Sequence, residues 1–298
     1  MPSTTFQWLA VTALVTSLTL APDSLASNVK LEFELSDKFS QAQKKTVKTW
    51  LEQGLNATEH SIAPMPLSSL KFTVVKHHNN NHPVPWGQII RGKPNAVKLH
   101  VAAKASLNDL THDWTLYHEL SHLYLPYIEH SSFWLGEGFA SYMQYIIMYQ
   151  AGWLDRQSFL KNIKAGFERG RAKTRTVPGR LKDVAENMWQ LKAYRRVYWT
   201  GAAFFLEADI ALQKRGQSLH SVMAKYVNCC LTKYSRGKTL VAKLDRVSKT
   251  DIFSRLYQEY SVRTDFPKVT ERQLNQIADF YGQEAVNHKN DGNKKGSK

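Results

Sequence analysis

The sequence is poor in cysteine: its 298 residues include only Cys229 and Cys230, which are adjacent. This excludes the multi-bridge framework that holds small secreted domains together. A bridge between neighbouring cysteines is strained, so we expect two separate thiols, buried or unpaired, with a regulatory vicinal bridge as the alternative. A hydrophobic core must then hold the fold, and a hydrophobic content of 43% is sufficient for one.

Long apolar runs are scarce as well. The run from Trp8 to Ala21 is short for a membrane span. The small-residue pattern Ser24-Leu25-Ala26 follows it, which is typical of a secretory signal. We therefore predict that residues 1–26 are a signal peptide and that the protein is exported, either periplasmic or secreted. The alternative is an uncleaved segment that anchors the protein in the membrane.

Acidic residues are outnumbered, with 25 Asp and Glu against 40 Lys and Arg and a net charge of +15. Such an excess of basic residues favours contact with anionic surfaces. The alternative interpretation is a basic surface that has no specific partner. Residues 169–180 (RGRAKTRTVPGR) concentrate this charge, and their Gly and Pro predict a loop that could act as a lid. No aromatic residue interleaves with these arginines, so we expect no specific nucleic-acid partner. The basic, low-complexity residues 287–298 predict a disordered tail.

Alternating apolar and polar residues characterise the first part of the mature chain. They predict strands at residues 29–35, 70–75 and 96–101, and an edge strand at residues 86–91 flanked by Pro and Gly. Between the first two strands, Ser36 or Asp37 can cap a helix that runs through Trp50. Residues 27–108 are therefore predicted to form an α+β N-terminal lobe.

The helical period dominates after residue 108. Apolar residues three and four apart predict helices at residues 109–124, 132–151, 155–168, 197–214, 217–231, 238–247, 251–261 and 270–285. Residues 109–286 are therefore predicted to form a helical lobe. The expected fold class is α+β, with two lobes and a cleft where they meet.

The run HELSH lies near this junction. His118 and His122 are four residues apart, so on a helix they project from one face and can bind a single ion. Glu119 then stands beside the metal without binding it. A catalytic zinc takes three protein ligands and leaves a position open for water, so a third ligand is needed.

The residues that follow the HELSH run include three candidates for the third ligand: Glu129, His130 and Glu137. Pro126 ends the first helix, and Ser131 or Ser132 can cap the next one, whose first turns contain Glu137. Two antiparallel helices joined by a short loop would return Glu137 to the histidines. Glu129 and His130 in the loop are competitors, but a helix fixes a ligand more firmly than a loop does, which favours Glu137.

HELSH followed by WLGEGFASY resembles the gluzincin zinc metallopeptidases of the aminopeptidase N type, whose catalytic domain is thermolysin-like. The resemblance covers about residues 110–210. It implies one catalytic Zn²⁺, with Glu137 as the third ligand beside His118 and His122. Fourteen residues separate His122 from Glu137, which is fewer than is usual in that family.

A second match implies further roles. The segment VYWTGAAFFLEAD resembles the family segment in which a tyrosine, with a glycine shortly after it, stabilises the oxyanion. Tyr198 and Gly201 match these two residues, and the resemblance implies the oxyanion role for Tyr198. The alternative is a tyrosine that packs at a helix start, with Tyr194 nearby. The family chemistry also implies that Glu119 is the general base.

These residues predict a zinc-dependent peptidase that acts on a peptide or protein substrate. The alternative is a catalytically silent protein with the gluzincin fold that binds an anionic component of the cell envelope. The aminopeptidases carry a glycine-x-methionine-glutamate-asparagine run that binds the substrate's amino group, and no such run precedes His118. An endopeptidase, or a peptidase with few substrates, is therefore expected at least as much as an exopeptidase.

Other features have simpler interpretations. The loop of residues 77–82, with three histidines, predicts a polar turn rather than a second metal site. Arg195 and Arg196 either contact the substrate or lie at a solvated helix start. Four tryptophans at helical apolar positions are expected in the core: Trp114, Trp134, Trp153 and Trp189.

Overall fold

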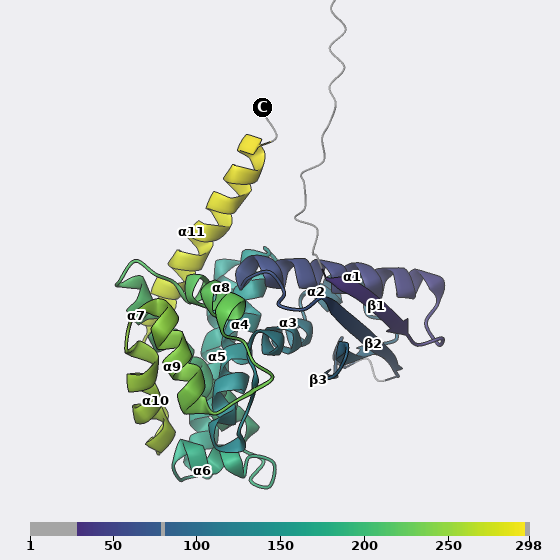
Figure 1. Cartoon of the computed structure of the whole chain (residues 1–298). Coiled ribbons are helices and arrows are strands. Elements are labelled where there is room, and N and C mark those ends of the chain that lie inside the picture. The colour runs from purple at the N-terminus through teal and green to yellow at the C-terminus, as the bar shows by residue number, and fades with distance from the viewer. Residues whose placement is uncertain (1–28, 79–80, 296–298) are drawn as a thin grey trace, which may run out of the picture.

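The computed structural model of the chain describes residues 29–78 and 81–295 (Figure 1). The predicted signal peptide and its cleavage site lie outside the described residues. Within them, no helix is both long and apolar enough to cross a membrane.

A four-stranded sheet forms the core of the first lobe. Its strands are β1 (Lys30–Leu35), β2 (Ser69–His77), β3 (Trp86–Ile90) and β4 (Asn95–Ala102), in the order β1-β2-β4-β3. The pairings β1–β2 and β2–β4 are parallel, whereas β3 pairs antiparallel with β4 and lies at the edge of the sheet. The prediction of three alternating strands and one edge strand is confirmed.

Helix α1 (Gln41–Ser61) runs beside this sheet (Figure 1). It buries Val47, Trp50 and Leu51 in the core, at the spacing that a helix requires. Its N-cap is Ser40, not Ser36 or Asp37 as predicted, because Ser40 forms a capping box with Gln43.

Helices make up nearly all of the second lobe. They are α2 (Leu107–Thr111), α3 (Thr115–Ser121), α4 (Phe133–Gln150), α5 (Arg156–Thr176), α6 (Leu181–Glu186), α7 (Tyr194–Gln213), α8 (Leu219–Cys229), α9 (Gly237–Ser248), α10 (Ile252–Val262) and α11 (Glu271–Lys295). Two 3₁₀ turns, η1 (His122–Tyr124) and η2 (His130–Ser132), and a short parallel pair, β5 (Tyr127–Ile128) and β6 (Tyr234–Ser235), complete it. The α+β, two-lobed fold class is confirmed.

Two helix predictions need correction. The helix expected at residues 109–124 is divided into α2, α3 and η1, because the Asp113 side chain accepts hydrogen bonds from the backbone N–H groups of Thr115 and Val84. These bonds give the chain an alternative to continuous helix. The tail expected to be disordered from residue 287 is helical through Lys295, since an established helix gains one backbone bond with each added residue.

The basic segment at residues 169–180 is mostly helix rather than loop. Helix α5 continues to Thr176, so only residues 177–180 connect it to α6. The guanidinium groups of Arg169 and Arg171 lie over the rings of Trp199 and Phe266. Because these arginines pack on aromatic side chains, they do not form the lid that the sequence allowed.

The two cysteines also differ from expectation. Cys229 and Cys230 form a vicinal disulfide at the end of α8, where separate thiols were favoured. The Arg246 side chain lies 3.1 Å from the sulfur of Cys230 and approaches it from α9.

Helices α4 and α7 cross at a pair of glycines. A Cβ atom on Gly138 would collide with the backbone of Gly201, and one on Gly201 would collide with the Trp134 carbonyl. The two helices can approach so closely only because neither residue has a side chain at the crossing. The contact places Glu137 of α4 next to the first turns of α7, where Tyr198 lies.

The crossing predicts a strong response to one methyl group. In Gly201→Ala the new Cβ has no space, so we expect the free energy of unfolding to fall by about 2 kcal/mol or more. For a chain of this size, that lowers the melting temperature by roughly 4 °C or more. Thermal denaturation measures the effect.

Gly136→Ala is the matched control, since it lies in the same helix α4 and its Cβ would have no neighbour closer than 3.7 Å. We expect it to be neutral or stabilising by up to about 1 kcal/mol, because alanine is the better helix former. Equal melting temperatures for the two variants would contradict the close crossing.

Candidate metal centre

A cleft of about 610 Å³ lies between the edge strand β3 and the helices α3, α4 and α7. Its floor contains residues of HELSH and WLGEGFASY together with Tyr198. Segments far apart in the sequence therefore meet where the two lobes join.

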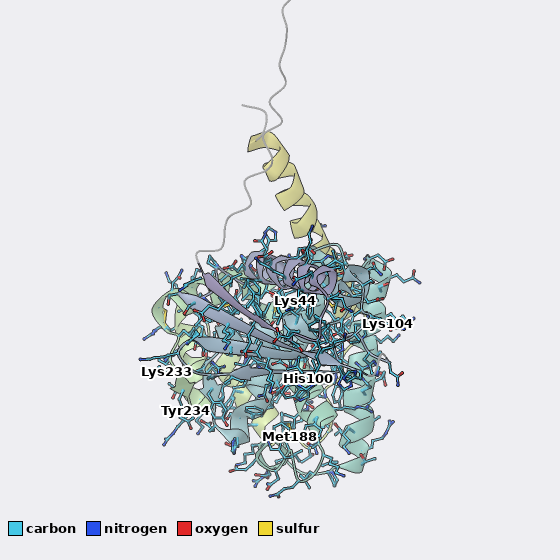
Figure 2. The ribbon with its side chains drawn as sticks, turned by 90° about the vertical axis from the view of Figure 1, so that its right-hand side faces the viewer. Lys44, His100, Lys104, Met188, Lys233 and Tyr234 are labelled. Carbon is cyan, nitrogen blue, oxygen red and sulfur yellow. A yellow bond between two sulfur atoms is a disulfide. The ribbon has the colours of Figure 1, made fainter. Side chains whose placement is uncertain are left out.

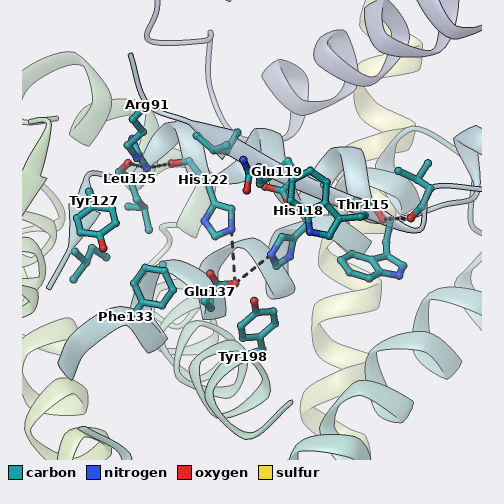
Figure 3. A pocket seen from close by; sticks show the side chains of 18 of the residues that line it. Arg91, Thr115, His118, Glu119, His122, Leu125, Tyr127, Phe133, Glu137 and Tyr198 are labelled. Atoms are coloured by element: carbon teal, nitrogen blue, oxygen red, sulfur yellow. Dashed lines mark hydrogen bonds and ion pairs between the residues drawn. The ribbon is translucent and has the colours of Figure 1, made fainter. Parts of the chain in front are cut away.

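Three candidate metal ligands converge in this cleft. The Nε2 atoms of His118 and His122 lie 3.3 and 3.7 Å from Oε2 of Glu137 (Figure 3). One potential ligand atom from each residue lies within 4.8 Å of the other two. This is the set that the sequence favoured.

The competing ligands have other partners. Glu129 accepts hydrogen bonds from the Ser132 hydroxyl and the Gly237 backbone, both at 2.9 Å. The His130 ring is 3.0 Å from the Tyr127 hydroxyl. Both residues thus stabilise the connection that turns the chain from α3 back into α4, and Glu137 reaches the histidines.

Burial and charge set the protonation of the three ligands. Burial raises the pKa of Glu137, but the neighbouring His122 and His118 outweigh it and the pKa is lowered. Burial lowers the pKa of His122 to about 4, so its ring is neutral near pH 7. For His118, burial is outweighed by the Glu137 carboxylate and the pKa is raised. Glu137 and His122 thus have the states that a metal site requires, an ionised carboxylate and a neutral imidazole.

The donor set fits a zinc ion. Two imidazole nitrogens and one carboxylate are the three ligands of a common type of catalytic zinc site. Oε2 of Glu137 is buried and has no hydrogen-bond partner among the described residues, which leaves it available to a cation. On its far side, the His118 ring donates from Nδ1 to Oε1 of Gln144 at 2.9 Å, which directs Nε2 towards the cleft.

Glu119 lies beside the three ligands and beneath the edge strand. A Cβ atom on Gly87 would come within 3.0 Å of the Glu119 side chain and 2.8 Å of Thr115, so this glycine lets β3 pack directly on α3. Burial raises the pKa of Glu119 to about 7. A carboxyl group with such a pKa can accept and return a proton near neutral pH.

Tyr198 closes the opposite side of the site. Its ring stacks on His118 with centroids 5.7 Å apart, and its hydroxyl group interacts with Glu137 (Figure 3). Burial, followed by the charge of Glu137, raises the pKa of Tyr198 well above its usual value. The hydroxyl therefore keeps its proton and can donate a hydrogen bond. Tyr194 is not among the residues that line the cleft.

Several cleft residues were not anticipated. Gln144 lies two helical turns after Glu137, so a buried polar residue on the same face of α4 was the available signal. Trp114 and Trp189, expected in the core, line the cleft and are 41% and 59% exposed. Trp134 is buried as predicted, and Trp153 packs partly buried against the core.

Arg196 fits neither of its two interpretations. It is buried, and its guanidinium donates to the backbone carbonyls of Val177, Gly179 and Thr264. It therefore stabilises the turn between α5 and α6. Arg195 is exposed and does not line the cleft, so neither arginine contacts the site.

Comparison with known proteins gives two kinds of match. The family model for the M61 glycyl aminopeptidases matches residues 121–203, which include His122, Glu137 and Tyr198. A search of curated proteins finds no match.

Solved structures supply the second kind. An aminopeptidase N family protein from Idiomarina loihiensis has a TM-score of 0.60 and 17% identity, over 83% of this chain and 47% of that one. The M1 zinc metallopeptidase from Deinococcus radiodurans has a TM-score of 0.52 and 12% identity, over 80% and 48%. A variant of the latter enzyme, bound to a Tyr-Ser-Ala substrate, has a TM-score of 0.52 and 14% identity, over 83% and 52%.

At these identities the likeness shows the fold, and the chain spans about half the length of the solved structures it matches. The resemblance to the gluzincins that HELSH and WLGEGFASY suggested is confirmed for the fold. The chain thus has the fold of the aminopeptidase N and M1 zinc metallopeptidases, and a central part of it matches the M61 glycyl aminopeptidase model.

Proposed function

We propose that the protein is a zinc-dependent peptidase, with one ion held by His118, His122 and Glu137. The observation that carries this proposal is the convergence of these ligands in a cleft that also holds Glu119 and Tyr198. A site that merely bound zinc would need neither a buried carboxyl group with a pKa of about 7 nor a protonated phenol. The zinc and peptidase names of the matched proteins agree with the proposal.

When bound, zinc lowers the pKa of water and polarises a carbonyl group. Glu119 takes the proton of the attacking water and passes it to the departing amine, for which its raised pKa is suited. Tyr198 donates a hydrogen bond to the oxygen on which negative charge develops. His118 is kept in the right tautomer by Gln144.

The peptide would lie along the edge strand. The outer edge of β3 has no partner strand within the described sheet, and the backbone N–H of Ile89 points towards Glu119. An extended peptide can add to such an edge through backbone hydrogen bonds. This pairing would bring its carbonyl groups past the metal ligands.

The first test is Glu119→Gln, which keeps the shape of the side chain but removes the base. We expect zinc to bind as in the wild type and the turnover number to fall by about 10²- to 10⁴-fold. Zinc content and hydrolysis of a mixed peptide library measure both effects. Glu168→Gln, an exposed change on α5, is the control and should leave both unchanged.

Wild-type activity in Glu119→Gln would rule out this residue as the base. Stoichiometric zinc without hydrolysis by the wild type would instead favour the catalytically silent protein that binds an anionic component of the envelope.

Tyr198→Phe separates the oxyanion role from packing. The ring remains to stack on His118, so we expect zinc binding and KM to change little while kcat falls by about 10²- to 10³-fold. Tyr194→Phe is the matched control, because Tyr194 lies outside the cleft lining. If both variants lost activity equally, a specific role for the Tyr198 hydroxyl would be refuted.

Gln144 should act on the metal through His118. Gln144→Leu removes the acceptor of the Nδ1 proton, so we expect zinc affinity to fall by about 10- to 100-fold. Competition with a chelating dye measures the dissociation constant. Gln144→Glu restores an acceptor and should recover most of the affinity, and an unchanged affinity in the leucine variant would show that Gln144 does not position the ligand.

A further inference from the structure

The carboxyl groups of the cleft are already engaged by the site itself. Among the described residues that line it, Glu119 and Glu137 are the only acidic ones. Glu137 lies between the two histidines, and Glu119 is buried against Gly87 of β3. A free amino terminus carries a positive charge, and binding it away from water requires a dedicated anionic partner. The cleft offers none beyond the two groups that the chemistry uses.

Apolar side chains line both ends of the cleft. Beyond His118, Trp114 packs edge-on against the imidazole with ring centroids 5.5 Å apart. Beyond His122 lie Leu125, Tyr127 and Phe133, which Figure 3 shows to one side of the metal ligands, with Thr115 on the other side. The ligands thus lie between two apolar walls rather than at the closed end of a pocket.

Both ends also reach solvent. Trp114 is 41% exposed, and Trp189, another aromatic residue of the cleft lining, is 59% exposed. At the other end Tyr127 is 42% exposed and stacks with exposed Tyr234, which Figure 2 shows at one side of the molecule. A polypeptide can therefore enter at one end and leave at the other, and neither end stops the chain.

Exposed apolar groups gathered at one place mark a binding surface. Five of the eight large hydrophobic residues that the structure leaves exposed lie in the cleft lining or in contact with it: Trp86, Trp114, Tyr127, Trp189 and Tyr234. Aromatic rings bury much area at little cost in side-chain entropy. The apolar walls therefore select apolar side chains on the bound chain.

The geometry points to an endopeptidase that takes an internal, apolar segment of a polypeptide, with apolar side chains on both sides of the scissile bond. This inference rests on the proposed peptidase function. Backbone pairing with β3 orients the segment, and contacts with the two walls fix its position along the strand. Trp114 at one end and Tyr127 at the other determine specificity.

The test uses the zinc-loaded protein and quenched fluorescent peptides of ten residues. Each peptide has Phe or Leu on both sides of its centre and is made twice, once with free ends and once with an acetylated amino end and an amidated carboxyl end. We expect both forms to be cleaved internally with kcat/KM values within about threefold of each other. Among the described lining residues no carboxylate is left for an amino end, and Arg91 already donates to the carbonyls of His122 and Leu125. Mass spectrometry locates the cuts.

Replacing the apolar residue on either side by Ser is expected to lower kcat/KM by about tenfold or more, as one buried apolar contact is lost. Trp114→Ala should weaken the preference on one side of the bond, and Tyr127→Ala the preference on the other. Val262→Ala is the matched control, because Val262 is as exposed but lies on α10 outside the cleft lining.

The outcomes separate this inference from the proposed function. Stepwise removal of residues from free amino ends, with no cleavage of the blocked peptides, would overturn the inference and leave the peptidase function intact. Internal cleavage without preference for apolar residues would overturn the assigned specificity. No hydrolysis of any peptide by the zinc-loaded protein would overturn both proposals.

Discussion

The close crossing of α4 and α7 is the contact on which the site depends. Gly138 and Gly201 meet backbone to backbone. This contact brings together Glu137, which directly precedes Gly138, and Tyr198, which lies about one helical turn before Gly201. A side chain at either glycine would separate the helices, and the phenol would then no longer reach the carboxylate. The geometry of the candidate site is thus set by packing between helices and not by flexible loops, which keeps its side chains in fixed positions.

Burial gives the grouped side chains their chemical character. Water is largely excluded around His122, Glu119 and Tyr198, so each tends to its neutral form. Glu137 is the exception, because two imidazoles face it and stabilise its charge. Their surroundings thus give the two carboxyl groups of the cleft different protonation states. Glu137 is an anion that faces the two histidines, whereas Glu119 titrates near neutral pH.

The parts of this arrangement that were predictable from the sequence are those with a short, local signature. Strands showed as alternation, and the grouping of His118, His122 and Glu137 followed from helical spacing and the expected return of the chain. Gln144 was missed although it is two turns from Glu137, because a single glutamine in an apolar helix has many uses. The role of Arg196 could not be inferred, since its three carbonyl partners include Thr264, far along the chain. Trp114 and Trp189 have helical spacing like core residues, and only the tertiary structure shows that their faces are left open.

The edge strand links this architecture to the choice of substrate. Gly87 lets β3 lie directly on α3, so the free backbone groups of the strand and the Glu119 carboxyl share one narrow space. A bound chain would already be aligned with the reacting groups by its backbone alone, whatever its side chains are. Selectivity must then come from what the backbone does not fix, namely the side chains that project from the bound segment. The described cleft meets these with apolar walls on both sides, and its two carboxyl groups belong to the candidate site. Under the inference drawn above, discrimination among substrates would therefore rest on apolar fit and not on the charge of a chain end.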